Sequence, residues 1–318
     1  MAGKEPVIIT DKEEMRKWTR TMRSKNHTIG FVPTMGYLHE GHLSLVQEAQ
    51  KHTDLIVVSI YVNPGQFSPN EDLSTYPSDF QGDIQKLKSV ANGVDVVFHP
   101  KNLYDYGNSE MGLIRSAERI NEKENEGLKV VSCVEDKGMG HETWVRVENL
   151  EKGLCGKSRP VFLRGVATIV TKLFNIVEPD VAVFGKKDYQ QWRIIQRMVR
   201  DLEFGIMVIG SEIVREHDGL AMSSRNVKLS PEDRKKALSI SRALSKAKVE
   251  AEKGQVSCRD LINVAIQTID EAGGRVDYAE IVEQESLEPV ETIKRPVVFC
   301  VAAWFGKVRL VDNMEINI

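Results

Sequence analysis

A strand–helix–strand pattern between residues 28 and 62 constrains the fold most strongly. A short apolar strand at Ile29–Val32 is ended by Pro33, and apolar residues at helical spacing follow over Leu43–Ala49. The run Asp54–Val62 is then almost continuously apolar. Such a run is typical of a strand that is buried on both faces of a parallel sheet. The segment therefore predicts a βαβ unit.

The alternation of strand and helix continues to residue 210. We expect further strands at Val7–Ile9, Gly93–Phe98, Thr143–Val147, Asp180–Phe184 and Gly205–Ile209. Helices are expected between them, and Arg164–Val177 has a pronounced apolar stripe. This alternation predicts an α/β fold, a Rossmann-like doubly wound parallel sheet, over residues 1–210.

Residues 211–318 follow a different pattern. Two expected helices, Ser230–Lys253 and Arg259–Ala272, precede three expected strands, Val276–Val282, Val297–Ala303 and Val308–Val311. Because the strands no longer alternate with helices, we expect a smaller C-terminal α+β domain. Its first loop carries Met222-Ser-Ser-Arg225, so we expect this domain to act as a lid over a site on the first.

The segment of about 101–141 differs in character from its surroundings. Much of it is charged and poor in aromatic residues. A chain of that composition buries little apolar surface. We therefore expect an insertion in the first domain that lies outside the core.

Composition and charge exclude several classes of protein. The chain has 318 residues, of which 28% are charged and 41% hydrophobic, with a net charge of -3 and both signs interspersed. A dedicated nucleic-acid binder needs a basic face, and this balance argues against one. No stretch is apolar enough to span a membrane, and the acidic N-terminal region does not suit a transit peptide. We expect a cytosolic protein with reduced cysteines.

Three polar motifs are placed where anions bind. His39 and His42 lie at the start of a predicted helix, Gly185–Asp188 follows a predicted strand, and Met222–Arg225 lies in a loop. A helix N-terminus presents unpaired N–H groups and attracts negative charge. Each motif alone could be a cap, a pair of solvated lysines or a turn, and the two histidines could also bind a metal. Their combination at one sheet edge favours a site for ATP.

Two amide side chains follow the second strand of the βαβ unit. Asn63 and Gln66 come directly after Asp54–Val62. In open α/β sheets, ligands bind at the carboxyl ends of the strands. The amides are therefore placed to bind a small polar substrate. A turn stabilised by Asn63 is the alternative interpretation.

Five motifs spread along the chain form a specific set. They are PTMGYLHEGHLSLV, SIYVNPGQF, SRPVFLRGVATIV, FGKKDYQQ and DGLAMSSRN. The set resembles the pantothenate synthetase family, also called pantoate–β-alanine ligase, and is most similar to its plant members. The likeness extends over nearly the whole chain. The family belongs to the nucleotidyltransferases with an HxGH motif and a KMSKS-like loop, which here is Met222–Arg225.

The resemblance implies an AMP-forming carbon–nitrogen ligase of coenzyme A biosynthesis. ATP would activate the carboxylate of pantoate as pantoyl adenylate, and the amine of β-alanine would then displace AMP to give pantothenate. The resemblance also implies Mg²⁺ with ATP and a homodimer, and no nucleic-acid or membrane partner is expected. Two alternatives stay open at this point, another HxGH nucleotidyltransferase and a non-catalytic nucleotide-binding module.

The resemblance further implies a role for each matching residue. The catalytic residues would be His39, His42, Lys187 and Arg225. The ATP site would consist of Met35, Gly36, His39, His42, Gly185, Lys187, Asp188, Val214, Met222, Ser223, Ser224 and Arg225. Pantoate and β-alanine would contact Asn63, Gln66, Tyr76, Arg159 and Gln191, with Lys172 beside them. Asp83 is the candidate ligand of Mg²⁺. Because Gly82 stands where bacterial members carry an acidic neighbour, ATP oxygens and water could hold the metal instead.

Overall fold

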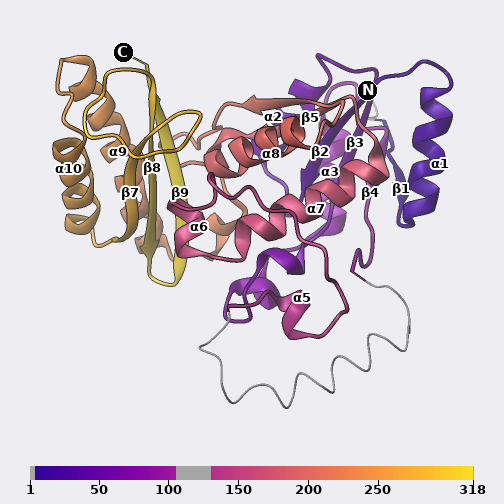
Figure 1. The fold of residues 1–318 in the computed structure, drawn as a ribbon, viewed down its shortest axis with the longest axis horizontal. Coiled ribbons are helices and arrows are strands. Elements are labelled where there is room, and N and C mark those ends of the chain that lie inside the picture. The colour runs from indigo at the N-terminus through magenta and orange to yellow at the C-terminus, as the bar shows by residue number, and fades with distance from the viewer. Residues whose placement is uncertain (1–3, 105–129, 318) are drawn as a thin grey trace.

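The computed structural model describes residues 4–104 and 130–317 (Figure 1). The strands are β1 (Val7–Ile9), β2 (Ile29–Thr34), β3 (Leu55–Ile60), β4 (Val96–Phe98), β5 (Val181–Gly185), β6 (Met207–Ser211), β7 (Arg275–Glu283), β8 (Val297–Phe305) and β9 (Val308–Ile316). The α-helices are α1 (Lys12–Arg23), α2 (Glu40–Ala49), α3 (Phe80–Ser89), α5 (Cys133–Asp136), α6 (Leu154–Ser158), α7 (Phe162–Val177), α8 (Tyr189–Asp201), α9 (Pro231–Glu252) and α10 (Cys258–Glu271). Short 3₁₀ helices are η1 (Pro64–Gln66), η2 (Asp72–Thr75), η3 (Lys186–Asp188) and η4 (Ser224–Lys228).

The larger sheet is parallel and has the strand order β1-β4-β3-β2-β5-β6. Helices cover both of its faces. Successive residues of a strand point to opposite faces, and β3 follows this rule, since Val57 joins one hydrophobic cluster while Ile56 and Val58 join another. The nearly continuous apolar run therefore predicted a doubly buried strand correctly. The predicted doubly wound α/β architecture is confirmed.

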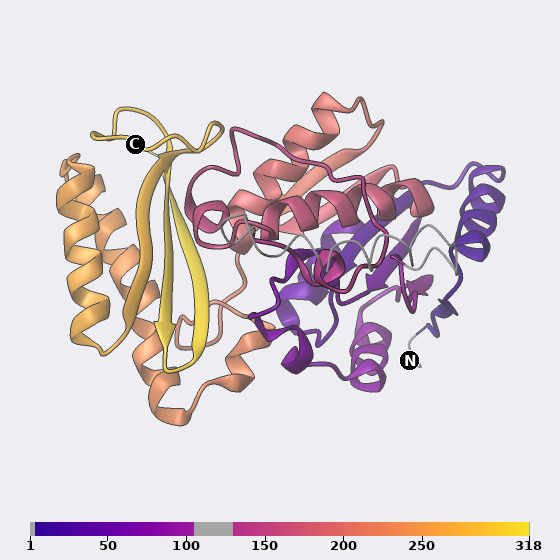
Figure 2. The ribbon, with the colours of Figure 1, turned by 60° about the horizontal axis from the view of Figure 1, so that its bottom comes forward.

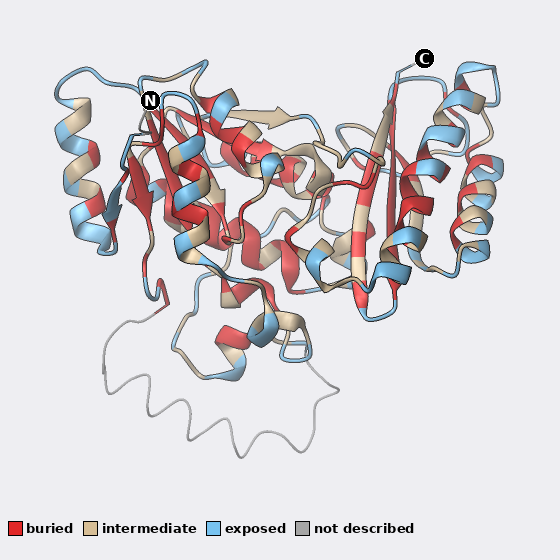
Figure 3. Ribbon diagram, turned by 180° about the vertical axis from the view of Figure 1, so that it is seen from behind, coloured by how far each residue is buried: buried red, intermediate tan, exposed pale blue. Residues whose placement is uncertain are grey.

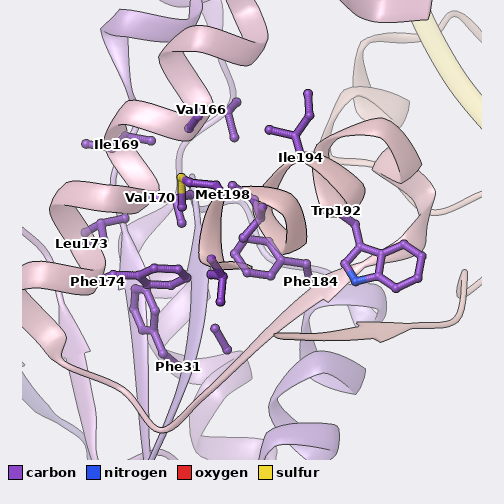
Figure 4. Close-up of a cluster of buried hydrophobic side chains, with 14 of the residues drawn as sticks. Phe31, Val166, Ile169, Val170, Leu173, Phe174, Phe184, Trp192, Ile194 and Met198 are labelled. Carbon is purple, nitrogen blue, oxygen red and sulfur yellow. The ribbon is translucent and has the colours of Figure 1, made fainter. Parts of the chain in front are cut away.

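Helices α7 and α8 build the main core on one face of this sheet (Figure 4). Their apolar side chains converge on those of β2 and β5, as Figure 4 shows around Phe31, Phe174 and Phe184. The rings of Phe31 and Phe174 meet edge to face, with centroids 6.4 Å apart. The apolar stripe of α7 predicted this packing, because most of the helix is buried.

The smaller sheet is antiparallel, in the order β7-β8-β9, and helices α9 and α10 cover its outer face (Figures 1 and 2). Strand β8 is buried on both faces, as Figure 3 shows. Val297, Phe299 and Val301 pack with the two helices, whereas Val298 and Cys300 pack towards the larger sheet. The expected C-terminal α+β arrangement is confirmed, and a domain boundary between residues 210 and 211 stays a prediction.

The ends of the segment 101–141 belong to the core, which contradicts our expectation. Tyr104 and Val134 are buried, and the Tyr104 hydroxyl donates a hydrogen bond of 2.9 Å to Oδ1 of Asn63. The prediction was wrong because it rested on the charged middle of the segment, whereas apolar residues at its two ends pack against other parts of the fold. Residues 105–129 of the expected insertion lie outside the described part of the chain.

A second prediction is also wrong. Residues 143–147 form no strand, and the N–H of Val145 donates to the hydroxyl of Thr168 on α7 at 3.0 Å instead of to a neighbouring strand. Trp144 and Val145 pack against the main core, which explains the apolar alternation. Within residues 4–104 and 130–317, no helix combines the length and the apolar character needed to cross a membrane.

Helix α7 approaches the loop after β3 so closely that only glycine fits at residue 165. A Cβ atom there would lie 2.2 Å from the carbonyl oxygen of Gly65 and 2.5 Å from Cα of Gln66. The helix backbone thus forms a wall against which η1 is set. The position of Gln66 depends on this contact.

We expect Gly165→Ala to destabilise the protein by about 1–3 kcal/mol, because η1 or α7 must move to relieve the overlap. Urea denaturation measures the change in the free energy of unfolding. Gly205→Ala is the matched control, since no atom lies within 4 Å of a Cβ atom at that exposed position. Equal stability of the two variants would contradict the proposed contact.

Candidate active site

A cavity of about 620 Å³ lies between the carboxyl edge of the larger sheet and strand β9. Most of the predicted site residues line it. They are Met35, His39, His42, Asn63, Gln66, Tyr76, Arg159, Gly185, Lys187, Asp188, Gln191, Val214, Met222, Ser223, Ser224 and Arg225. Gly36, Asp83 and Lys172 are not part of the lining. The sequence thus predicted a set of residues that the fold brings together from distant segments.

The parallel pairing of the strands explains this location. Strand β2 pairs with β3 on one side and with β5 on the other, so their carboxyl ends lie at the same edge. The chain leaves β2 towards β3 and leaves β5 towards β6, which lie on opposite sides of the β2–β5 pair. A crevice opens at such a switch point in a doubly wound sheet. The two histidines follow β2, and the lysine loop η3 follows β5.

The two histidines of the HxGH motif lie against each other at the start of α2. Their ring centroids are 4.1 Å apart, and the N–H of His39 donates to Nδ1 of His42 at 3.3 Å. Because Nδ1 of His42 accepts this bond, its neutral ring carries the proton on Nε2. Nδ1 of His39 is buried and has no partner among the described residues. The pair can therefore present neutral N–H donors to a ligand.

Burial and nearby lysines keep both imidazoles uncharged at neutral pH. Burial, followed by the positive charges of Lys187 and Lys86, lowers the pKa of His39 from 6.5 to about 4. Burial also holds the pKa of His42 well below its usual value, with His39 and Lys187 as further causes. Desolvation disfavours the charged form of a buried base. In the protein without a bound anion, these histidines are hydrogen-bond donors and not cations.

The loop η3 presents Lys187 and Asp188 to the cavity. Nζ of Lys187 lies 3.1 Å from a carboxylate oxygen of Asp188. Burial alone would raise the pKa of Asp188, but the charge and hydrogen bond of Lys187 outweigh it and leave the pKa lowered. The carbonyls of Lys186 and Lys187 accept hydrogen bonds from the side chain of Asn313 on β9. No motif pointed to Asn313, since the contact joins residues 126 positions apart.

The loop Met222–Arg225, called the MSSR loop below, forms the wall of the cavity opposite to η3. The Ser224 hydroxyl donates to the carbonyl of Tyr37 at 3.1 Å, which ties this loop to the segment after β2. Arg225 binds Asp72 through Nε and Nη2, at 3.1 and 2.9 Å, and Lys228 binds the same carboxylate at 2.8 Å. These cations hold the pKa of Asp72 well below its usual value in spite of its burial. Asp72 was missed by the sequence analysis because nothing local marks its pairing with a residue 153 positions away.

Asn63 positions its neighbour, and its expected contact with a substrate stays a prediction. Its Nδ2 donates to Oε1 of Gln66 at 2.9 Å and to the carbonyl of Gly165 at 3.1 Å. Its Oδ1 accepts from the Tyr104 hydroxyl at 2.9 Å and from the N–H of Gly65 at 3.2 Å. These bonds fill the capacity of the amide. In the described residues Nε2 of Gln66 has no partner, and Gln66 lines the cavity, so this donor is available to a ligand.

Two further residues with a predicted substrate contact, Arg159 and Tyr76, line the cavity. Arg159 donates from Nε to Glu71, and its guanidinium carbon lies 3.9 Å from the ring centroid of Phe162. Tyr76 packs edge to face on Phe67, and burial raises the pKa of its phenol. Because Glu71 holds Arg159 and packing holds Tyr76, both present fixed polar groups.

Asp83 shapes a loop, and its role as a ligand of Mg²⁺ stays a prediction. Its Oδ2 accepts from the N–H of Tyr37 at 2.8 Å and its Oδ1 from the N–H of Leu38 at 2.6 Å. Asp83 is 1% exposed and is not among the residues that line the cavity. Gly36, with φ of 83°, allows the turn that brings these N–H groups to Asp83.

The role of Lys172 beside the substrates also stays a prediction. Its Nζ lies 4.8 Å from the centroid of the Tyr104 ring, and Lys172 is not among the residues that line the cavity. The helical rotation of α7 places residues such as Val166 and Leu173 towards the cavity instead.

Mg²⁺ fits this cavity only together with a phosphate ligand. No group of three or more His, Cys, Asp or Glu side chains in the described part of the chain could hold a metal. The carboxylates of the lining are each paired with a cation, and they are Glu71, Asp72, Asp188 and Glu212. Mg²⁺ is commonly held by substrate phosphates, water and few protein oxygens.

Comparison with known proteins identifies the family. A family model described as pantoate-beta-alanine ligase matches residues 7–315. The chain belongs to the pantoate–β-alanine ligase family. The pantoate–β-alanine ligase of Lotus japonicus is 69% identical over 314 residues, covering 98% of this chain and 99% of the relative. The same enzyme of Arabidopsis thaliana is 67% identical, covering 99% of each. The predicted resemblance, including its plant character, is confirmed.

Solved structures of the ligase family share the fold. Pantothenate synthetase from Thermus thermophilus superposes with a TM-score of 0.80 at 37% identity, covering 98% of this chain and 100% of that one. The ligase from Francisella tularensis, complexed with β-γ ATP and β-alanine, superposes with a TM-score of 0.72 at 30% identity and covers 97% of each chain.

The histidine pair is expected to make the fold less stable in acid. Unfolded His39 takes up a proton near pH 6.5, whereas the folded protein resists this down to about pH 4. Within that window the unfolded state binds more protons, so the free energy of unfolding falls as the pH falls. His39→Gln removes one such titration and should make the dependence shallower. Urea denaturation between about pH 7 and pH 4 measures the slope, and a slope as steep as that of the wild type would contradict the assignment.

Proposed function

We propose that this chain condenses pantoate with β-alanine to give pantothenate, AMP and diphosphate through a pantoyl-adenylate intermediate. One observation carries the proposal. A single cavity joins a set of N–H and cationic groups suited to a triphosphate, contributed by His42, Lys187 and Arg225, to the amides of Gln66 and Gln191. Membership of the pantoate–β-alanine ligase family supports the choice of substrates.

In the first step, a carboxylate oxygen of pantoate attacks the α-phosphorus of ATP. The bond from that phosphorus to the bridging oxygen breaks, and diphosphate leaves with the electron pair. Negative charge then grows on the phosphate oxygens. Nε2–H of His42 and the ammonium of Lys187 are placed to stabilise it, and fixed donors in a site shielded from water are effective for this purpose.

Arg225 is available for the phosphates although it is paired. Asp72 occupies its Nε and Nη2, and within the described residues Nη1 has no partner. A guanidinium has five N–H donors, so two remain on Nη1. Asp72 thus holds the arginine in a fixed orientation. A fixed orientation lowers the activation barrier of the transfer, in addition to the effect of the positive charge.

In the second step, the amine of β-alanine attacks the carbonyl carbon of pantoyl adenylate. The bond from that carbon to the phosphate oxygen breaks, AMP leaves, and the nitrogen loses a proton. Activation is needed because a free carboxylate is a poor acyl donor. Nε2 of Gln66, oriented by Asn63, is placed to hold the hydroxy acid during both steps.

We further propose that Mg²⁺ accompanies ATP, held by phosphate oxygens and water, where it neutralises charge on the leaving diphosphate. The proposal is completed by a homodimer in the cytosol, without nucleic-acid or membrane partners.

The order of the two steps provides the main test. Labelled diphosphate should exchange into ATP when pantoate and Mg²⁺ are present and β-alanine is absent, because the amine enters only after the adenylate forms. Another nucleotidyltransferase would exchange only with its own substrate, and a nucleotide-binding module would not exchange at all. Exchange that required β-alanine would rule out the two-step order.

Gln66→Ala should weaken the exchange mainly by raising the concentration of pantoate that is needed. A lost neutral hydrogen bond costs about 0.5–1.5 kcal/mol, which corresponds to a several-fold higher KM for pantoate. The KM for ATP serves as the internal control, since Gln66 lies with the substrate amides. A change confined to the KM for ATP would contradict the assigned role.

His42→Ala should slow the formation of pantoyl adenylate by at least about a hundredfold, as expected for a lost donor to a developing charge. Single-turnover measurements with pantoate and ATP follow the rate directly. Circular dichroism and the melting temperature check that the variant folds. Adenylate formation at a nearly normal rate would remove His42 from the chemistry.

A further inference from the structure

Strand β9 reaches across to the lysine loop through one buried amide. Nδ2 of Asn313 donates to the carbonyls of Lys186 and Lys187, at 2.9 Å each. Asn313 is 4% exposed, so water has little access to replace these bonds. A primary amide has two donors on one nitrogen and can hold two neighbouring carbonyls at once. The backbone that presents Lys187 is therefore fixed from the C-terminal sheet.

A buried ion pair extends this connection. The N–H of Asn313 donates to Oδ1 of Asp312 at 2.8 Å. The same carboxylate binds Nη1 and Nη2 of Arg215, at 2.7 and 2.9 Å. Asp312 is 4% exposed, so removing Arg215 would leave the charge of Asp312 buried without compensation. The three residues are thus held as one unit.

Arg215 connects this ion pair to the MSSR loop. It pairs with Ala221 in an antiparallel bridge, and the N–H of Met222 donates to the carbonyl of Val214 at 3.0 Å. Nη1 of Arg215 also donates to the carbonyl of Gly219 at 3.1 Å. This tight turn ends where the MSSR loop begins, so the loop starts from a fixed point.

We propose that Asn313, acting through Asp312 and Arg215, is a positioning residue that sets the spacing between Lys187 and the Ser223–Arg225 loop. This inference rests on the proposed function, because it assigns both loops to one triphosphate. A polyanion in transfer needs donors at fixed separations, and a displacement of about 1 Å is enough to lower a rate by about a hundredfold. The C-terminal sheet thus takes part in the geometry of the site and does more than cover it.

The side chains of β9 support a role directed at this loop. Glu315, two residues beyond Asn313 and on the same face of the strand, binds Nζ of Lys186 at 3.0 Å and accepts from the Tyr189 hydroxyl at 3.2 Å. Strand β9 itself pairs with β8 along its whole length through main-chain bonds. The sheet therefore does not need the Asn313 amide in order to form.

Asn313→Leu removes both donors at a similar side-chain volume. Pantoate-dependent exchange of diphosphate into ATP should fall by between about tenfold and a hundredfold in turnover, with the KM for pantoate unchanged. Gln284→Leu is the matched control. Its amide likewise donates to a main-chain carbonyl of β8, that of Val297 at 3.1 Å, but outside the cavity, so exchange should stay at the wild-type rate.

A double-mutant cycle with Lys187→Ala separates positioning from a general loss of structure. If Asn313 acts through Lys187, adding Asn313→Leu to Lys187→Ala should lower the exchange by less than about twofold. If the double variant loses exchange by the product of the two separate fold-decreases, the inference is overturned. A wild-type rate for Asn313→Leu alone would also overturn it. Should Asn313→Leu not fold, judged by its melting temperature, Asn313→Ala carries the same test. Absence of pantoate-dependent exchange in the wild type would instead refute the proposed function.

Discussion

The pairing of β2 with β3 on one side and with β5 on the other is the constraint on which the site depends. In a parallel sheet all strands end at one edge, so the segments that follow β2, β3 and β5 are brought together whatever their separation along the chain. Apolar burial of β2 and β3 on both faces fixes this register, since a slip of one residue would turn each side chain to the other face. The histidines, the substrate amides and the lysine loop inherit their positions from it.

Burial then sets the electrostatics of the cavity. A low-dielectric wall disfavours charged imidazoles, and Lys187 and Lys86 add to the effect, so His39 and His42 remain neutral donors. The pKa values of Asp72 and Asp188 are lowered by the cations beside them, chiefly Arg225 and Lys187 respectively. The result is a site with fixed positive charge and neutral N–H groups, which suits a highly charged anion.

Both sheets contribute residues to the cavity, and they contribute different ones. The larger sheet supplies the edge on which the substrate amides and histidines lie, and the smaller sheet approaches it through β9. Asn313 and Glu315 of that strand contact the loop η3, while the Arg215–Asp312 pair connects the strand to the turn before the MSSR loop. Some of the contacts between the two parts of the fold thus fall on the segments that bear the cations.

The sequence by itself determined the α/β class and the α+β character of the C-terminal part, and most of the site residues that it predicted line the cavity. These features depend on residues that are close together in the sequence, through apolar periodicity and short motifs such as His39–His42 and Gly185–Asp188. Only the tertiary structure decided which polar groups are free to act. Asn63 and Asp83 stand at positions with a predicted role. In the fold, neighbouring groups occupy all the donor and acceptor sites of the Asn63 side-chain amide, and each carboxylate oxygen of Asp83 accepts a main-chain N–H. Asp72 and Asn313 carry no local signal, because a hydrogen bond depends on distance in space and these partners are far apart in the chain.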